Sequence, residues 1–568
     1  MRNTVRACIL DHYERHAEQV YVRCLLPNGE DTRVTYRRLV ERGSAFAAAL
    51  RSRGVEPGQI VVVILPHSAD LYCSFFGAVL GGMVPSMLAV PSMKLNPRHY
   101  REELEALLRR TEAAAVITDV ETAEHLGWAG TADRDEAIPL TGARLLLADH
   151  VGEGVSRVAE ARVAPDDLVL LQHSSGSTGL KKGVALSNRA VLEQVRVYAE
   201  ALELRAGDRI ASWLPLYHDM GLIACALLPV ITGTPVTALS PFHWITRPAA
   251  FLRAIQEDRC TLAWMPNFAY EFLAARVRES QLEGLDLGSM RGWINCSEPT
   301  VAESHRKFLA RFTPYGVRPE TLWTCYAMAE TTFAVTQSGP RTPARVEAVD
   351  RELFLTRLQA RLAEPGSASL ELLSAGPLLP GTEARIVDDA GRELGEREVG
   401  EIALRCGSLF NGYFREPAAT AAALRDGWYY SGDLGYLADG HLFVTGRKKD
   451  VIIVAGKNLY PQDIERVVSA VPGIYPGRCV ALGWDDPSIG TQRLIVLAEV
   501  ADESLVGSPE LETAVRTAVS ERMDCAIDDL RLLPHMWLLK TSSGKIARRP
   551  NLRRYLEELA AAPAAVTA

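Results

Sequence analysis

The sequence predicts an α/β protein: a large N-terminal domain of two doubly wound α/β subdomains plus a small β unit, followed by a small mobile α+β C-terminal domain. Apolar runs suited to buried strands occupy residues 60–66, 114–119 and 168–175. Such runs, followed by helical patterns, are typical of doubly wound sheets. Residues 77–93 and 225–242 each run from an apolar helix through a glycine turn into a proline-flanked strand. This repetition favours two related α/β layers.

The pattern of expected strands and helices changes after about residue 375. Residues 382–406 alternate short strands with tight turns, which predicts a small antiparallel β unit. From Gly446 onward, strand and helix patterns form a compact α+β tail of about 120 residues, which is long enough for a separate domain. We therefore predict an N-terminal domain over residues 1–445 and a C-terminal domain over residues 446–568.

The composition excludes several classes of protein. The chain has 568 residues, of which 48% are hydrophobic and 23% charged, so it can build a large core and is not disordered as a whole. Its net charge of -8 provides no global basic field for nucleic acid or an anionic membrane. The ten cysteines include no CxxC pair, so no zinc ribbon or thioredoxin motif is present. Free thiols in a cytoplasmic protein fit this pattern best.

Two uncharged stretches, residues 71–93 and 220–243, are long enough to span a bilayer. Glycine and proline interrupt both of them, which favours a buried helix followed by a buried strand. Residues 1–20 carry charges where a signal peptide needs an apolar run. We therefore expect a soluble protein without a membrane span.

The most informative segment, residues 171–187, is an apolar strand that runs into a serine- and glycine-rich turn followed by lysine. Small residues allow the backbone to approach a polyphosphate, whose oxygens can accept from N–H and hydroxyl groups, and lysine adds positive charge. The Walker A pattern is absent. The alternative is a flexible surface turn. The candidate phosphate-binding residues are Ser174, Ser175, Gly176, Ser177, Thr178, Gly179 and Lys182.

Two further signals lie towards the C-terminus. Lys545 follows a glycine in a short polar segment, although a lone lysine in a basic tail is usually only solvated. Asp433 lies in a turn after an expected strand, where a carboxylate can bind a ribose diol. Arg447 opens a charged junction between two apolar strands, which could equally be a solvated linker.

These motifs, together with residues 213–223, 266–272 and 456–465, resemble in content and order those of the adenylate-forming (ANL) superfamily. The resemblance covers nearly the whole chain and is strongest to fatty acyl-AMP ligases. Residues 345–373 are longer than a direct connection needs. Fatty acyl-AMP ligases are known for an insertion at this place that discourages the use of coenzyme A.

The resemblance implies that a carboxylic acid reacts with ATP to give acyl-adenylate and pyrophosphate. Because the carboxylate must attack an anionic phosphate, neutralising charge is the main task of such a site. Glu330, with Thr178, would hold Mg²⁺, and Lys545 and His218 would act at the reacting carboxylate and α-phosphate. The nucleotide would be bound by Asp433, Arg447 and the residues of the phosphate loop, together with Asn295, Ser297, Glu298, Tyr326, Ala327 and Met328, with Tyr326 stacking on adenine.

Lys545 lies about a hundred residues beyond the other site residues, in the C-terminal domain. It can act only when that domain closes over the nucleotide. The resemblance therefore implies a hinge at Lys449 and a domain movement that exchanges adenylation for acyl transfer.

The acyl group needs an apolar channel. Met220, Met265, Phe268 and Met328 stand next to the motifs and could line it, although each could equally be plain core. Cys296 and Ala327 replace residues with less side-chain volume in the usual motifs. We expect this difference to affect the choice of acid more than the chemistry.

Three readings of the function remain open. In the first, a fatty acyl-AMP ligase loads the phosphopantetheine thiol of an acyl carrier protein, and the basic run at 548–555 either meets that acidic partner or is only solvated. In the second, an acid–thiol ligase makes acyl-CoA. In the third, a nucleotide-binding module has lost catalysis.

Overall fold

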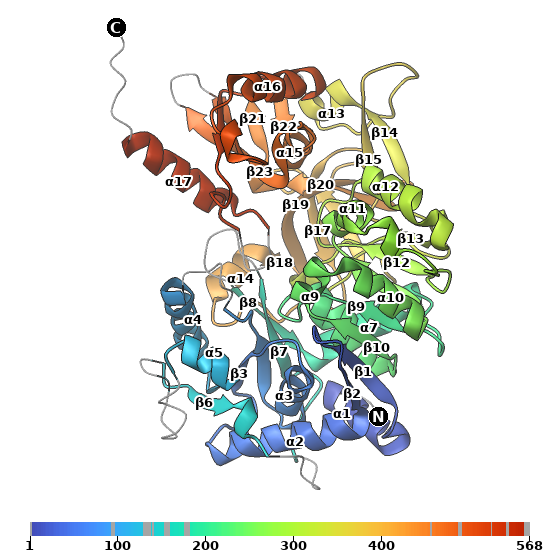
Figure 1. Cartoon of the computed structure of the whole chain (residues 1–568), viewed down its shortest axis with the longest axis vertical. Helices are drawn as coiled ribbons and strands as arrows, with labels where there is room; N and C mark the ends of the chain where they lie inside the picture. Colours follow the sequence, from blue (N-terminus) through green and yellow to red (C-terminus); the bar gives the residue numbers. More distant parts are fainter. Residues whose placement is uncertain are drawn as a thin grey trace.

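The computed structural model confirms the expected α/β architecture, with a large lobe and a smaller C-terminal lobe beside it (Figure 1). In the described part of the chain, no helix is long and apolar enough to cross a membrane. All ten cysteines are free thiols. The structure describes residues 3–91, 97–128, 138, 141–152, 160–174, 182–454, 457–486, 491–523, 525–540 and 545–561.

The first layer of the large lobe is a seven-stranded sheet with the order β13-β12-β11-β9-β10-β1-β2. All neighbouring strands are parallel except β1 and β2, which form an antiparallel pair. Parallel strands are buried on both faces, which explains why these segments are continuous apolar runs. The strands are β1 (Val20–Leu25), β2 (Asp31–Thr35), β9 (Ile210–Ser212), β10 (Val236–Leu239), β11 (Leu262–Met265), β12 (Gly292–Asn295) and β13 (Leu322–Thr324).

The second layer is a four-stranded, fully parallel sheet with the order β4-β3-β5-β6. The two resembling stretches lie in different layers, because residues 77–93 lead into β4 and residues 225–242 into β10. The prediction of two α/β layers is therefore confirmed. The strands are β3 (Ile60–Ile64), β4 (Val84–Met87), β5 (Ala115–Thr118) and β6 (Arg144–Leu147).

Helices cover these layers and in places approach one another very closely. A Cβ atom at Gly77 of α3 would lie 2.5 Å from the backbone oxygen of Gly43 in α2, so only glycine allows this contact. The helices of the large lobe are α1 (Val5–His16), α2 (Tyr36–Ser52), α3 (Ala69–Leu80), α4 (Pro97–Thr111), α5 (Val120–His125), α7 (Asn188–Ala201), the π-helix η2 (Met220–Leu227), α8 (Leu228–Thr232), α9 (Pro241–Thr246), α10 (Pro248–Asp258), α11 (Asn267–Arg276), α12 (Ala302–Phe312) and α14 (Pro417–Ala423).

One expected strand pairs differently from the prediction. Residues 168–175 were expected in a doubly wound sheet, but β7 (Leu168–Ser174) forms an antiparallel hairpin with β8 (Lys182–Ser187). The connection between the two strands is too short for a parallel crossover, which needs a dozen or more residues. The serine- and glycine-rich segment between the two strands lies outside the described residues, apart from Ser174 and Lys182 at its ends.

A small antiparallel β unit follows, as the sequence predicts. Its strands are β16 (Glu383–Val387), β17 (Gly400–Arg405), β18 (Leu424–Arg425), β19 (Trp428–Ala438) and β20 (His441–Arg447). The register of β19 and β20 places Asp433 opposite Arg447. Two candidate nucleotide-binding residues are therefore cross-strand neighbours.

The insertion at residues 345–373 folds into β14 (Val346–Asp350), α13 (Arg351–Arg357) and β15 (Ser369–Leu373), and β14 and β15 form an antiparallel pair. Phe354 of α13 packs against Tyr460 with ring centroids 5.6 Å apart. The Nδ2 of Asn458 donates to the backbone oxygen of Leu355 at 3.1 Å. The insertion therefore contacts the segment that opens the C-terminal lobe.

The C-terminal lobe has its own apolar core. Its strands and helices agree with the expected α+β tail, and the predicted boundary at residue 445 stays a prediction. The elements of this lobe are β21 (Ile452–Val454), β22 (Lys457–Leu459), α15 (Pro461–Ser469), β23 (Ile474–Asp486), β24 (Thr491–Val500), α16 (Pro509–Met523), β25 (Asp529–Leu533) and α17 (Arg548–Ala561).

Candidate active site

Asp433, Arg447 and Tyr326 form one connected group at the edge of the β unit. The hydroxyl of Tyr326 donates to Asp433 Oδ2 at 2.6 Å, and Arg447 Nε lies 3.2 Å from Asp433 Oδ1. The Asp433 carboxylate raises the pKa of Arg447, and burial together with Asp433 raises the pKa of Tyr326. Two donors therefore hold the Asp433 side chain, whose oxygens can accept from hydroxyl groups.

Glu330 and Lys182 both contact Tyr413, a residue that was not predicted from the sequence. Glu330 lies in a short 3-10 helix (Ala329–Thr331), and its Oε1 accepts from the Tyr413 hydroxyl at 2.8 Å. The Nζ of Lys182 lies 4.5 Å from the centroid of the Tyr413 ring, a cation–π distance. Tyr413 therefore joins the expected metal ligand to the lysine of the phosphate loop.

Burial raises the pKa of Glu330, and the hydrogen bond from Tyr413 opposes this shift. A carboxylate in such surroundings gains when a cation neutralises it. An oxygen ligand of this kind fits Mg²⁺, which prefers carboxylates together with phosphate oxygens. The described residues contain no cluster of three or more metal-ligating side chains, so a metal here would need ligands from a bound phosphate or water, or from undescribed residues.

Lys545 reaches across from the C-terminal lobe to the large lobe. Its Nζ donates to the backbone oxygen of Ser297 at 2.8 Å. Asp219 and Glu298 both lie near enough for the Lys545 charge to favour their ionised forms, which is an effect in the direction of lower pKa. Burial has the larger effect at Glu298 and leaves the pKa of this group raised.

His218 stands next to this group through Asp219. Its Nδ1 lies 2.6 Å from Asp219 Oδ1. Burial opposes the ionisation of Asp219, but His218 and the backbone N–H of Met220 outweigh it and leave the pKa of Asp219 lowered. Asp219 was not among the predicted site residues, although it directly follows His218 in the motif.

Ser297 has an unusual backbone. Its φ of +68° lies in the left-handed region, which non-glycine residues rarely adopt. This conformation directs the carbonyl that Lys545 contacts. Strain of this kind persists only where the surrounding structure enforces it, and it concentrates at functional sites.

Two of the expected acyl-lining residues, Met220 and Phe268, contact the segment around Ser297. Met220 Sδ lies 3.7 Å from the Ser297 hydroxyl, and the backbone N–H of Phe268 donates to the Glu298 carboxylate at 3.1 Å. Met220 and Met265 are buried, and Phe268 is 46% exposed. The rings of Trp213 and Trp244 stack with centroids 3.7 Å apart, and the Phe268 ring stands edge-on to both.

Other expected residues have different surroundings. The side chain of Asn295 donates to Asn267 and contacts His305 inside the large lobe. Ala327 bridges to Ala334, and Met328 donates from its backbone N–H to Phe333. These contacts support the segments that carry Ser297 and Tyr326.

Lys449 lies in a short 3-10 helix (Lys448–Asp450) directly after Arg447, and burial and the Arg447 charge lower its pKa. Ser174 is the last residue of β7, and its side chain is outside the described part. Five residues expected in the phosphate loop also lie outside the described residues: Ser175, Gly176, Ser177, Thr178 and Gly179.

The fold and these contacts place the candidate nucleotide-binding residues on the large lobe and Lys545 on the smaller lobe, within reach of each other. The model of the family described as AMP-binding enzyme matches residues 11–414. The chain therefore belongs to the AMP-binding enzyme family, within the adenylate-forming superfamily, which confirms the resemblance seen in its motifs.

Known proteins similar to this chain include fatty acyl ligases. The medium-chain-fatty-acid–[acyl-carrier-protein] ligase JamA of Moorena producens is 30% identical over 566 residues, which cover 96% of this chain and 93% of JamA. A structure from a study of fatty acyl-adenylate ligases of E. coli and L. pneumophila matches with a TM-score of 0.87 and 31% identity, covering 99% of this chain and 98% of that one. The L. pneumophila fatty acyl-adenylate ligase in complex with acyl adenylate and pyrophosphate matches with a TM-score of 0.74 and 26% identity, covering 98% of this chain and 96% of that one.

Proposed function

We propose that this protein is a fatty acyl-AMP ligase. It activates a fatty or related carboxylic acid with ATP to acyl-AMP and releases pyrophosphate. It then transfers the acyl group to the phosphopantetheine thiol of an acyl carrier protein, and AMP leaves with the electrons of the broken acyl–oxygen bond. The observation that carries the proposal is the contact of Lys545 with Ser297, because it brings a cation of the C-terminal lobe to a candidate nucleotide-binding segment of the large lobe. The similarity to JamA over nearly the full length of both chains supports the choice of acid and acceptor.

In the first step, a carboxylate oxygen of the acid attacks the α-phosphorus of ATP, and pyrophosphate leaves with the electrons of the broken P–O bond. Two anions must approach each other, so the protein has to supply fixed positive charge. Lys545 would hold the oxygens of the reacting carboxylate and the α-phosphate. Lys182 and the serine- and glycine-rich turn would hold the leaving pyrophosphate.

The remaining polar residues orient the nucleotide. Asp433 would accept hydrogen bonds from the ribose hydroxyls, and Arg447 holds Asp433 in place for this. Tyr326 would stack on adenine while its hydroxyl keeps the bond to Asp433. Glu330 would hold Mg²⁺, which when bound neutralises phosphate charge.

The acyl end of the substrate would lie beyond Lys545. Met220, Met265, Phe268 and Met328 would line its channel, and His218 would stand near the carboxylate. Methionine suits a flexible chain because it adapts its shape to its neighbours. Cys296, buried beside Ser297, would narrow the channel and select among acids.

For acyl transfer, the phosphopantetheine thiol must reach the acyl group at the position that Lys545 occupies in this structure. We propose that the C-terminal lobe, residues 446–568, turns about Lys449 after adenylation and removes Lys545 from the site. The insertion at 345–373 contacts the start of this lobe and would disfavour the arrangement that accepts coenzyme A. We place the protein in the cytoplasm, where its free cysteines would stay reduced.

A panel of carboxylic acids assayed for pyrophosphate release, with each adenylate identified by mass, tests the first step. We expect release that depends on a fatty acid and disappears in Lys545→Ala. If no acid on the panel causes release by the wild type, the protein is a nucleotide-binding module that has lost catalysis.

The acceptor is tested separately, with ATP, the preferred acid and either coenzyme A or a holo-acyl carrier protein. We expect acylated carrier protein and little acyl-CoA. Rapid formation of acyl-CoA would contradict the choice of acceptor but leave the adenylation reaction standing, and would identify an acyl-CoA synthetase.

A further inference from the structure

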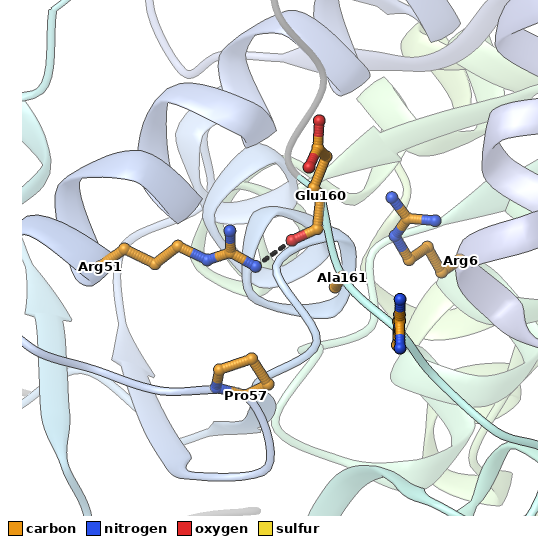
Figure 2. Close-up of a pocket in the computed structure, with 6 residues that line it drawn as sticks. Arg6, Arg51, Pro57, Glu160 and Ala161 are labelled. Atoms are coloured by element: carbon orange, nitrogen blue, oxygen red, sulfur yellow. Dashed lines mark hydrogen bonds between the residues drawn. The ribbon is translucent and has the colours of Figure 1, made fainter.

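A surface hollow of about 340 Å³ lies between the N-terminal helices and the segment that precedes β7. Helices α1 and α2, which border it, lie at the end of the large lobe opposite the C-terminal lobe (Figure 1). The hollow therefore lies apart from the candidate active site. Figure 2 shows the residues that line it: Arg6, Arg51, Pro57, Glu160, Ala161 and Arg162.

Two of the three arginines are positioned by backbone carbonyls. Arg6 Nε donates to the oxygen of Leu80 at 3.0 Å, and an Arg51 terminal nitrogen donates to the oxygen of Gly81 at 3.3 Å. The same nitrogen of Arg51 also donates to the backbone oxygen of Glu160 (Figure 2). The end of α3 and the segment before β7 thus hold two guanidinium groups at the hollow.

Two of the three arginines, Arg51 and Arg162, keep hydrogen-bonding capacity beyond these contacts. The Nε of Arg51 is buried and has no acceptor. Arg162 is exposed and makes no hydrogen bond or ion pair within the described part of the chain. A buried donor without an acceptor is costly, and an ion that is absent from the protein alone is one common explanation.

Two of the arginines also lie close enough to repel each other. Burial lowers the pKa of Arg6, and the neighbouring Arg51 charge adds to this shift, as like charges held together do. Glu160 presents its backbone oxygen to Arg51 and turns its carboxylate away from that guanidinium group (Figure 2). An anion between the arginines would relieve their repulsion.

We propose that this hollow binds a phosphate-bearing anion. Planar guanidinium groups match the geometry of phosphate oxygens and can bind them in pairs. Three arginines around one hollow stand out on a chain whose net charge is -8. A bound phosphate group would bridge α1, α2 and residues 160–162, the segment that leads into β7 and on to the serine- and glycine-rich turn.

Calorimetric titration of the full-length protein with inorganic phosphate and with pyrophosphate tests the site. We expect a binding event that weakens about tenfold in Arg162→Gln, because one charged hydrogen-bond donor is lost. Arg162 makes no described contact, so this variant should fold normally, and Arg51→Gln should weaken the same event. Arg522→Gln, which changes an exposed arginine of α16, is the matched control and should bind as the wild type does.

Lys182→Gln separates this event from binding at the proposed nucleotide site. The event should persist in Lys182→Gln. The proposal is wrong if the wild type binds neither inorganic phosphate nor pyrophosphate and also does not bind the phosphatidic acid vesicles described below. It is also wrong if binding survives in both Arg162→Gln and Arg51→Gln but is lost in Lys182→Gln.

The phosphate group could belong to a free anion or to a lipid headgroup, and vesicles distinguish these sources. Sedimentation with phosphatidic acid vesicles, lost in Arg162→Gln and absent with phosphatidylcholine vesicles, would identify a lipid headgroup. Binding of the soluble anions without sedimentation would identify a free phosphate compound. Either result supports the site, and sedimentation that is unchanged in Arg162→Gln counts against it.

Discussion

The Nζ of Lys545 lies 2.8 Å from the backbone oxygen of Ser297 and joins two residues that are 248 positions apart. The contact brings an ammonium group of the C-terminal lobe to the point where β12 ends in the large lobe. Strand ends of parallel sheets are common places for ligand binding.

We expect Lys545→Ala to reduce the rate of acyl-adenylate formation by about 10²–10³-fold, as for loss of one group that stabilises transition-state charge. Binding of ATP should remain, because Asp433, Arg447 and Lys182 are unchanged. Pyrophosphate release and calorimetric titration with ATP measure the two effects. Arg549→Ala, at an exposed position near the start of α17, is the control. Equal loss of ATP binding and of turnover would contradict the role of Lys545 in the chemical step.

We expect Asp433→Asn to weaken ATP binding by about tenfold to a hundredfold, because hydrogen bonds to a charged group each contribute about 1.5–3 kcal/mol. The substitution also removes the charge that Arg447 faces. The KM for ATP should rise more than kcat falls. Asp426→Asn, in an exposed turn, should leave both constants unchanged. A KM for ATP equal to that of the wild type would place the ribose elsewhere.

The activity should fall in acid at a higher pH than for an ordinary glutamate. Burial raises the pKa of Glu330, and only the ionised carboxylate can hold Mg²⁺, so activity is present above this raised pKa and lost as the pH falls through it. The Tyr413 hydroxyl stabilises the ionised form. Tyr413→Phe should therefore raise the pKa further and move the acid limb of kcat/KM to higher pH.

Pyrophosphate release measured as a function of pH at saturating Mg²⁺ checks this shift, and Tyr430→Phe is the control. An acid limb that stays in place in Tyr413→Phe, or moves to lower pH, would show that Glu330 does not control it.

The contact between the insertion and the C-terminal lobe should influence the acceptor. Asn458→Ala removes the hydrogen bond to the backbone oxygen of Leu355, a loss of about 1 kcal/mol that can shift a lobe equilibrium about fivefold. We expect acyl-CoA formation to rise by up to about fivefold while adenylation is unchanged. Asn28→Ala, in an exposed turn of the large lobe, is the control. An unchanged ratio of acyl-CoA to adenylate would show that this contact does not restrain the lobe.

Much of the fold could be predicted because its strands and helices are long apolar patterns with clear glycine and proline boundaries. β3, β5 and the helix–turn–strand units before β4 and β10 all appear as expected. The expectation that β7 belongs to a doubly wound sheet was wrong, because an apolar run alone does not show which strand it will pair with. The short connection between β7 and β8 decides that these two strands pair with each other.

The candidate site was predictable where its residues stand in ordered motifs. Asp433 and Arg447 meet as cross-strand partners, and Lys545 reaches the segment that contains Ser297. Tyr413 was missed because it lies 83 residues from Glu330 and belongs to none of the motifs. Only the folded chain brings such a residue to its partners.

The left-handed backbone of Ser297 has a consequence for the contact between the lobes, because its carbonyl is a neutral acceptor for the Lys545 ammonium group. An incoming phosphate or carboxylate offers the same ammonium group a stronger, charged acceptor. Substrate binding should therefore tighten a contact between the lobes that already exists, and the fraction of closed molecules should rise with the concentrations of ATP and acid.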